Sequence, residues 1–171
     1  MSRANVIVAL VAVLTAFAAP GVAQPDFSGE WTLTTATSNR VRGGGSGEQP
    51  VRQYVMDYSP FNCGRECRIV HKGSTLTVER AQFKDGATAP SPTVAIVFDG
   101  KSHTVVDSVT PNRTIESVAR WQDGKLVITS VVGRMLMTQT VSLEQNQLVV
   151  VRLGLITDPD SKWTLRYTRK K

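Results

Sequence analysis

The most restrictive feature of this chain is the period of its hydrophobic pattern. From residue 24 onward, apolar residues recur at a period of two far more often than at 3.6, and the β-branched residues Val, Ile and Thr are prominent. A period of two places successive side chains on opposite faces of an extended strand, whereas a helix needs a period of about 3.6. β-Branched side chains also fit a pleated, half-buried surface better than a helix. The pattern therefore predicts an all-β protein without a helix.

The expected strands are short and evenly spaced. They cover residues 29–35, 51–58, 68–73, 74–83, 93–99, 102–109, 113–122, 125–133, 134–145, 147–154 and 162–169. Gly or Asn lies in the connections, where either residue can adopt the positive φ of a tight hairpin. The clearest turns are Lys72-Gly73-Ser74, Asp99-Gly100-Lys101, Asp123-Gly124-Lys125 and Gln145-Asn146-Gln147. Strands joined in this way form an antiparallel meander.

A meander of this size must deal with its sheet edges. Open edges pair with other chains, and closure into a barrel removes them. We therefore expect residues 24–171 to form one antiparallel up-and-down β-barrel of about 8–10 strands, with a two-sheet β-sandwich as the alternative. Residues 36–50, which are rich in Gly, and residues 84–92, which contain Pro90 and Pro92, interrupt the pattern. We expect both segments to be surface loops at a barrel rim.

Residues 1–23 have the layout of a secretory signal peptide. Arg3 precedes an apolar run from Val6 to Ala19, and small residues follow a Pro-Gly break. The run is shorter than the roughly 20 residues of a transmembrane helix. We therefore expect cleavage after Ala23, export to the periplasm or to the outside of the cell, and no membrane span in the processed protein.

The chain is basic, with a formal net charge of +6. Its last basic residues are Arg166, Arg169, Lys170 and Lys171. They are not interleaved with a platform of aromatic residues that would stack on bases, and an exported protein has little access to nucleic acid. We expect a solvated end or contact with an anionic cell-surface polymer, and no nucleic acid partner.

Cys63 and Cys67 are the only cysteines. In an oxidising compartment such a pair closes a disulfide, which here would clip a loop just before a strand. His71 extends the pair to three metal-ligand types at spacings of four residues. An extended strand does not bring such spacings together, as a helix would. We therefore expect a disulfide and no metal.

Ser102, His103 and Asp107 have the residue types of a catalytic triad. Positions i and i+4 on a strand lie about 13 Å apart, too far for the base to bond the acid that orients it. No Gly-x-Ser-x-Gly elbow accompanies them. We expect binding without catalysis and without a cofactor. An enzyme is the third alternative, since glycosidase carboxylates often lie far apart in a sequence.

One face of the late strands combines apolar and polar residues. Met135, Met137 and Gln139 share a face of one strand, and Trp121 lies on a face with Ser117 in another. Flexible Met and flat Trp accept varied apolar shapes, so this face either lines a cavity or packs as plain core. Arg152 is either an interior charge that holds an anionic head group or, as we expect, a residue at the barrel rim.

One segment resembles the first strand of the lipocalin and fatty-acid-binding-protein group: Pro25-Asp26-Phe27-Ser28-Gly29-Glu30-Trp31-Thr32-Leu33. Its Phe-Ser-Gly-x-Trp start, with the later Trp121-Gln122-Asp123-Gly124-Lys125-Leu126, also resembles uncharacterised exported bacterial β-barrel proteins. The resemblance implies a calycin-type, lipocalin-like barrel with Gly29 and Trp31 as its structural signature. It also implies that Arg166 or Arg169 packs on Trp31.

The resemblance is incomplete on the last strand. Fatty-acid-binding proteins hold a carboxylate with Arg-x-Tyr there, whereas Arg166 and Tyr167 are adjacent in this chain and so point to opposite faces. The helical lid of those proteins would fall on the Gly-rich loop.

We therefore expect an exported, lipocalin-like barrel that binds a small apolar, amphipathic or anionic ligand. The candidate contact residues are Trp121, Met135, Met137, Arg152 and Tyr167. The alternative is a secreted or periplasmic protein-interaction or inhibitor module that presents its rim loops, residues 36–50 above all. An apolar cavity would favour the first function, and a filled interior with a projecting loop would favour the second.

Overall fold

The computed structural model describes residues 24–39, 47–48, 59–84, 87–89, 93–106, 114–132, 135–155 and 158–171. The signal peptide, its cleavage after Ala23, the expected strand 51–58 and most of the Gly-rich loop lie outside these ranges and stay predictions. Among the described residues no helix has the length and hydropathy needed to cross a membrane. The strands are β1 (Gly29–Ser38), β2 (Gly47–Glu48), β3 (Glu66–Lys72), β4 (Thr75–Arg80), β5 (Gln82–Lys84), β6 (Ala87–Ala89), β7 (Thr93–Val97), β8 (Ser102–Val106), β9 (Thr114–Gln122), β10 (Lys125–Val132), β11 (Met135–Glu144), β12 (Gln147–Leu155) and β13 (Asp158–Arg169).

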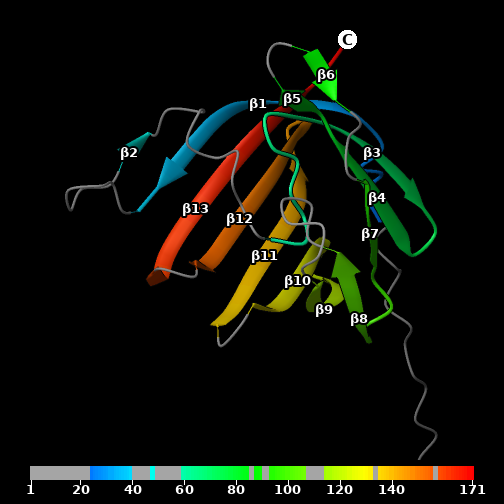
Figure 1. Ribbon diagram of the computed structural model, residues 1–171, viewed down its shortest axis with the longest axis vertical. Helices are drawn as coiled ribbons and strands as arrows, with labels where there is room; N and C mark the ends of the chain where they lie inside the picture. The colour runs from blue at the N-terminus through cyan, green and yellow to red at the C-terminus, as the bar shows by residue number, and fades with distance from the viewer. Residues whose placement is uncertain are drawn as a thin grey trace, which may run out of the picture.

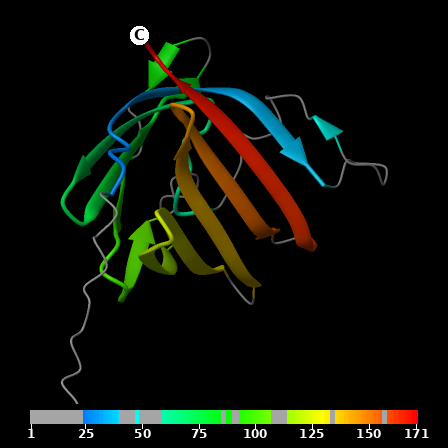
Figure 2. The ribbon, with the colours of Figure 1, turned by 180° about the vertical axis from the view of Figure 1, so that it is seen from behind.

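Ten antiparallel strands form a nearly closed barrel. Their hydrogen-bonded order is β7-β4-β3-β1-β13-β12-β11-β10-β9-β8. The pairing of β1 with β13 joins the two ends of the chain, and the sheet curls round on itself (Figures 1 and 2). The structure confirms the predicted all-β, up-and-down barrel and not the two-sheet sandwich. β2 pairs with the far end of β1, and the β5–β6 hairpin stands near the C-terminus (Figure 1).

Three of the four predicted turns join paired strands. Gly73 has φ 55° between β3 and β4, Gly124 has φ 72° between β9 and β10, and Asn146 has φ 63° between β11 and β12. Each of these residues adopts the left-handed conformation that a tight hairpin demands. The local turn chemistry and the strand pairing therefore agree at these three places.

The fourth turn breaks the meander. Gly100 has the expected positive φ of 79°, yet β7 and β8 on either side of it stand at the two ends of the hydrogen-bonded order. The backbone bonds go to other strands: Phe98 N donates to Ser74 O at 2.9 Å, and Gly100 N donates to Ala119 O at 3.0 Å. The expectation of a hairpin here is wrong, and the barrel is interrupted between β7 and β8.

The bounds of β1 and β13 differ from expectation because of strand pairing. β1 extends to Ser38, which pairs with Trp163 on β13, and β13 begins at Asp158, which pairs with Leu155 on β12. Part of the segment expected as a rim loop, residues 84–92, forms β6, which pairs with β5. The loop expectation is therefore wrong for residues 84 and 87–89, and that for residues 36–50 is wrong for 36–38 in β1 and 47–48 in β2. Pro90 and Pro92 lie outside the described residues.

Aromatic side chains fill one part of the barrel interior, which we call the aromatic end. Its members are Phe27, Trp31, His71, Phe98 and Trp121. Apart from Trp31, each of these rings contacts at least two others of the set, and the centroids of contacting rings lie 5.5 to 6.4 Å apart. Trp31 is fully buried, and its Nε1 donates to Phe27 O at 3.0 Å. The signature tryptophan thus ties the start of the chain to the core.

Gly29 leaves room for the Arg169 side chain, which covers the ring of Trp31. It has φ 141°, and a Cβ there would lie 3.2 Å from Arg169 Nε. Arg169 Cζ lies 4.9 Å from the centre of the Trp31 ring, a cation–π contact. The Gly-x-Trp motif therefore needs its glycine for the close approach of an arginine, and Arg169 is the partner that the resemblance implied.

Two other basic residues near the C-terminus, Arg166 and Lys170, form ion pairs. Arg166 points outward and donates to Glu144 Oε2 at 3.4 Å. Lys170 Nζ donates to Glu66 Oε2 at 2.7 Å, which raises the pKa of the lysine. The basic end is therefore solvent-exposed at Arg169, Lys170 and Lys171, as expected, although Arg166, Arg169 and Lys170 also contact side chains of the barrel; contact with an anionic polymer stays a prediction.

Candidate functional site

A segment of the chain lies inside the barrel just before β3. Residues 59–64, which we call the plug, are all buried, and Phe61 and Cys63 belong to the main hydrophobic core. Figure 1 draws this segment inside the ring of strands. An irregular segment can be buried only if its backbone polar groups find partners, because an unpaired buried N–H or C=O is costly.

Two inward side chains supply those partners at Phe61. Gln139 on β11 and Arg152 on β12 face each other across the ladder and are 0% and 3% exposed. Gln139 Nε2 donates to Phe61 O at 2.8 Å, and Gln139 Oε1 accepts from Phe61 N at 3.0 Å. Arg152 Nη2 and Ser59 Oγ donate to the same carbonyl at 3.4 and 3.2 Å. Three donors therefore converge on one buried oxygen.

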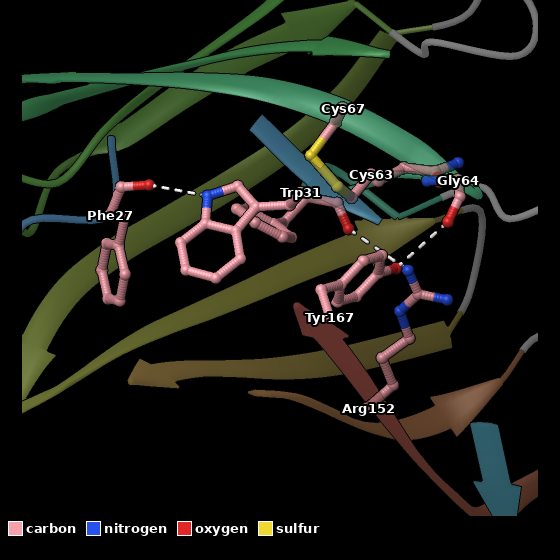
Figure 3. Close-up of a disulfide and its surroundings, with 9 residues drawn as sticks. Phe27, Trp31, Cys63, Gly64, Cys67, Arg152 and Tyr167 are labelled. Atoms are coloured by element: carbon pink, nitrogen blue, oxygen red, sulfur yellow. Dashed lines mark hydrogen bonds between the residues drawn. A yellow bond between two sulfur atoms is a disulfide. The ribbon is translucent and has the colours of Figure 1, made fainter. Parts of the chain in front are cut away.

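Tyr167 on β13 holds the other end of the plug. Its hydroxyl donates to Gly64 O at 3.3 Å (Figure 3). Gly64 N donates to Asn62 Oδ1 at 2.9 Å. Gly64 has φ 61°, and a Cβ at this residue would lie 2.8 Å from Arg80 Cδ. Both the turn and the close approach of Arg80 require glycine here.

A disulfide between Cys63 and Cys67 fastens the plug to β3 (Figure 3). Their Cα atoms are 5.0 Å apart. The predicted bond is thus present, although Cys67 lies within β3 and not before it. Both sulfurs are used in this bond and the His71 ring packs in the aromatic end, so these three residues do not form a metal site. The described residues hold no group of three His, Cys, Asp or Glu side chains suited to a metal ion.

A different set of side chains lines the interior next to Gln139, and we call it the serine layer. It consists of Ile115, Ser117, Ser130 and Met137. Met137 lies two positions before Gln139 on the same face, and Ser130 pairs with both Met137 and Ser117. Ser130 is 1% exposed, and among the described residues its Oγ has no hydrogen-bond partner. The layer thus combines apolar surface with small polar groups.

The structure separates the predicted contact residues. Trp121 belongs to the aromatic end, Met137 to the serine layer, and Arg152 and Tyr167 to the plug contacts. The expected rim position of Arg152 is wrong, because its side chain is buried in the interior. The side chain of Met135 lies outside the described residues.

Sequence reasoning missed the plug and the central place of Gln139. The available signal was a glutamine in an otherwise apolar inward row of β11, between Met137 and Val141. A buried amide implies a hydrogen-bond partner, but not which one. That partner, Phe61, is 78 residues away in the chain.

The residues of the rejected triad have another role. His103 Nε2 donates to Asp99 Oδ1 at 2.8 Å, and Lys101 N donates to the same oxygen at 2.9 Å. These bonds, that of Lys101 first, lower the pKa of Asp99. His103 therefore stabilises the Asp99 turn; Asp107 lies outside the described residues.

A depression of about 210 Å³ on the outer face of β1, β3 and β4 is a different kind of surface. Charged residues of both signs line it, among them Glu30, Glu66, Arg68 and Lys170. It offers little apolar surface for a ligand, and the Lys170–Glu66 ion pair already crosses it.

No family model and no curated protein matches the chain in sequence. The fold is similar to solved structures of small barrels. A fatty acid binding protein of Schistosoma mansoni in complex with arachidonic acid has a TM-score of 0.56 at 14% identity, and the match covers 86% of this chain and 98% of that one. The zebrafish ileal bile acid-binding protein complexed with cholic acid has a TM-score of 0.51 at 16% identity, covering 84% and 98% of the two chains. Human cRBP IV has a TM-score of 0.52 at 14% identity, covering 85% and 99%.

Proposed function

We propose that the protein binds a small amphipathic ligand inside its barrel, without converting it. The polar end of the ligand lies at Gln139 and Arg152, and its apolar part lies along Ile115 and Met137 in the serine layer. The observation that carries this proposal is the convergence of buried donors from Gln139 and Arg152 on a single acceptor oxygen in the interior.

The chemistry of these donors indicates the class of ligand. Donors that converge on a carbonyl oxygen also suit a carboxylate, and the positive charge of Arg152 strengthens such bonds. Met137 and Ile115 pack together beside this polar pair. A flexible thioether adapts to varied apolar shapes. An apolar molecule with a carboxylate or carbonyl end fits both parts.

The similar structures support the same class. The two solved with named ligands hold arachidonic acid and cholic acid, and each of these has an apolar body and a carboxylic acid. The comparison supports the proposal through the shared fold alone, since sequence identity is low.

Export is part of the proposal. The layout of residues 1–23 supports it, and so does the disulfide, because such bonds persist in oxidising compartments outside the cytosol. A carrier of apolar molecules in the periplasm or outside the cell would keep them apart from water.

A fluorescence titration tests the proposed function. The probe is dansylaminoundecanoic acid, with arachidonic acid and cholic acid as competitors. We expect saturable binding at one site and displacement by at least one competitor. Met137→Lys should weaken binding about tenfold or more, since it places a charge in the apolar part of the site. The matched control is Leu136→Lys, one residue away on the outer face and 64% exposed, which should leave the affinity unchanged. Absence of saturable binding, with the disulfide intact and after its reduction, would contradict the proposal.

A further inference from the structure

We propose that the plug occupies the place at Gln139 and Arg152 that the polar end of a ligand would take. The Cys63–Cys67 disulfide holds the plug in this place, and a ligand binds by displacing the plug. This inference rests on the proposed function and adds a means of regulation to the same site. The regulating chemistry is reduction of the disulfide by a dithiol.

The first argument is direct competition for the same atoms. Gln139 Nε2 and Arg152 Nη2 donate to the Phe61 carbonyl, and Gln139 Oε1 accepts from the Phe61 amide. The backbone N–H and C=O of Phe61 thus use both hydrogen-bonding ends of the Gln139 amide. A ligand oxygen in this place and the Phe61 carbonyl are therefore alternatives.

The second argument is that the plug is attached from one side by a short covalent link. Phe61 is two residues before Cys63, so the disulfide keeps it within about 7 Å of a fixed point on β3. A tethered group acts at a high effective concentration, in the millimolar range even for short flexible links. Opening the disulfide lengthens the tether and lowers that concentration.

Reduction balances as ordinary thiol–disulfide exchange. A dithiol attacks one sulfur of the bond between Cys63 and Cys67, and its second thiolate then resolves the mixed disulfide. The reductant leaves as its own disulfide, and the two cysteines become thiols. After reduction, the only covalent connection from Cys63 to β3 runs along the backbone through Gly64.

The affinity of the protein for the dansyl probe, measured with and without dithiothreitol, tests the regulation. We expect affinity to increase about fivefold or more on reduction, and the doubly substituted Cys63→Ser/Cys67→Ser protein to bind as tightly in both conditions as the reduced wild type. Equal affinity of the oxidised and reduced wild type would overturn the inference while leaving the proposed function intact. Absence of binding in every state would contradict the proposed function itself.

Hydrogen exchange at the Phe61 amide gives a second, independent readout. In the oxidised, ligand-free protein this N–H is bonded to Gln139 and should be protected. Saturation with the probe should speed its exchange about tenfold or more, since displacement exposes it. Unchanged protection in the saturated protein would mean that the plug and ligand bind together, and would overturn the inference.

Two substitutions distinguish displacement of the plug from a general loosening of the hydrophobic core. Phe61→Ala removes the plug's buried ring, and Phe98→Ala removes a ring of similar burial from the aromatic end. Both should lower the melting temperature, but only Phe61→Ala should increase affinity. Equal increases for the two variants would contradict the inference. If Phe61→Ala does not fold, the doubly serine-substituted protein provides the same comparison.

Discussion

The aromatic end and the serine layer are two regions of one barrel interior, and they differ in the kind of side chain that fills them. At the aromatic end, large rings pack on one another; the Trp31 indole N–H has its acceptor, whereas the Trp121 indole N–H has none among the described residues. In the serine layer, small side chains replace rings, and the Ser130 hydroxyl has no partner among the described residues. Along β11 the inward positions run from Val141 through Gln139 to Met137, so the plug contacts lie between these regions. From this difference we expect the aromatic end to contribute more to stability, and we place the proposed ligand site along the serine layer.

The largest expected effect is at the aromatic end. Trp31→Ala should lower the free energy of unfolding by about 3–5 kcal/mol, because it leaves a cavity and removes the surface that Arg169 covers. Urea denaturation measures the loss. The control Leu136→Ala, at an exposed position, should stay within about 0.5 kcal/mol of wild type. A loss below about 1 kcal/mol for Trp31→Ala would remove the contrast between the two regions.

The plug contacts come next. Gln139→Leu keeps the approximate volume but leaves the buried Phe61 N–H without its acceptor, and we expect a loss of about 2 kcal/mol in unfolding free energy. Thr140→Val, on the next, outward position of β11, serves as the control in the same urea titration and should be nearly neutral. A Gln139→Leu variant as stable as wild type would contradict the claim that the Gln139 hydrogen bonds hold the plug in the barrel.

The disulfide has a smaller expected effect, since it closes a short loop. Replacing both Cys63 and Cys67 by Ser should reduce stability by about 1–2 kcal/mol and lower the melting temperature without preventing folding. Alkylation of the denatured wild type without reductant should leave its mass unchanged. Two alkylated thiols would contradict the bond.

Ser130→Ala should be close to neutral, within about 1 kcal/mol, or stabilising, because it removes a buried hydroxyl that has no partner among the described residues. The matched control is Ser59→Ala, at a serine of similar burial whose Oγ donates to Phe61 O. Thermal melting should show a larger loss for Ser59→Ala than for Ser130→Ala. The reverse order would contradict the distinction between a hydrogen-bonded serine in the plug and a serine without a described partner in the serine layer.

The smallest effect concerns pH at the aromatic end. Hydrogen bonds from Ser28 lower the pKa of Asp26 below its ordinary value of 3.8, and the nearby His71 adds to the shift. Because the folded-state pKa is lower than the unfolded one, the stabilisation is complete above the unfolded pKa and is lost as pH falls through the folded pKa. The melting temperature of Asp26→Asn should therefore fall less than that of wild type between pH 4 and about pH 2. If the melting temperatures of the two proteins fall in parallel as the pH is lowered, the ionised Asp26 carboxylate does not contribute to stability.

Local sequence signals predicted most of the fold, and long-range contacts explain what they missed. Alternation and turn residues such as Gly124 and Asn146 located the paired hairpins, since φ and side-chain period are local properties. Gly100 has the same turn chemistry, but its flanking strands do not pair with each other. The plug has no periodicity, and its partner Arg152 is 91 residues away from Phe61. Its burial follows from tertiary hydrogen bonds that no local pattern announces.

Native mass spectrometry of the protein equilibrated with arachidonic acid and with cholic acid tests directly whether the barrel holds a ligand. We expect a complex with one ligand per chain, more abundant after the disulfide is reduced and depleted in Met137→Lys. Only the bare protein mass, in both the oxidised and the reduced state, would contradict a ligand site inside the barrel.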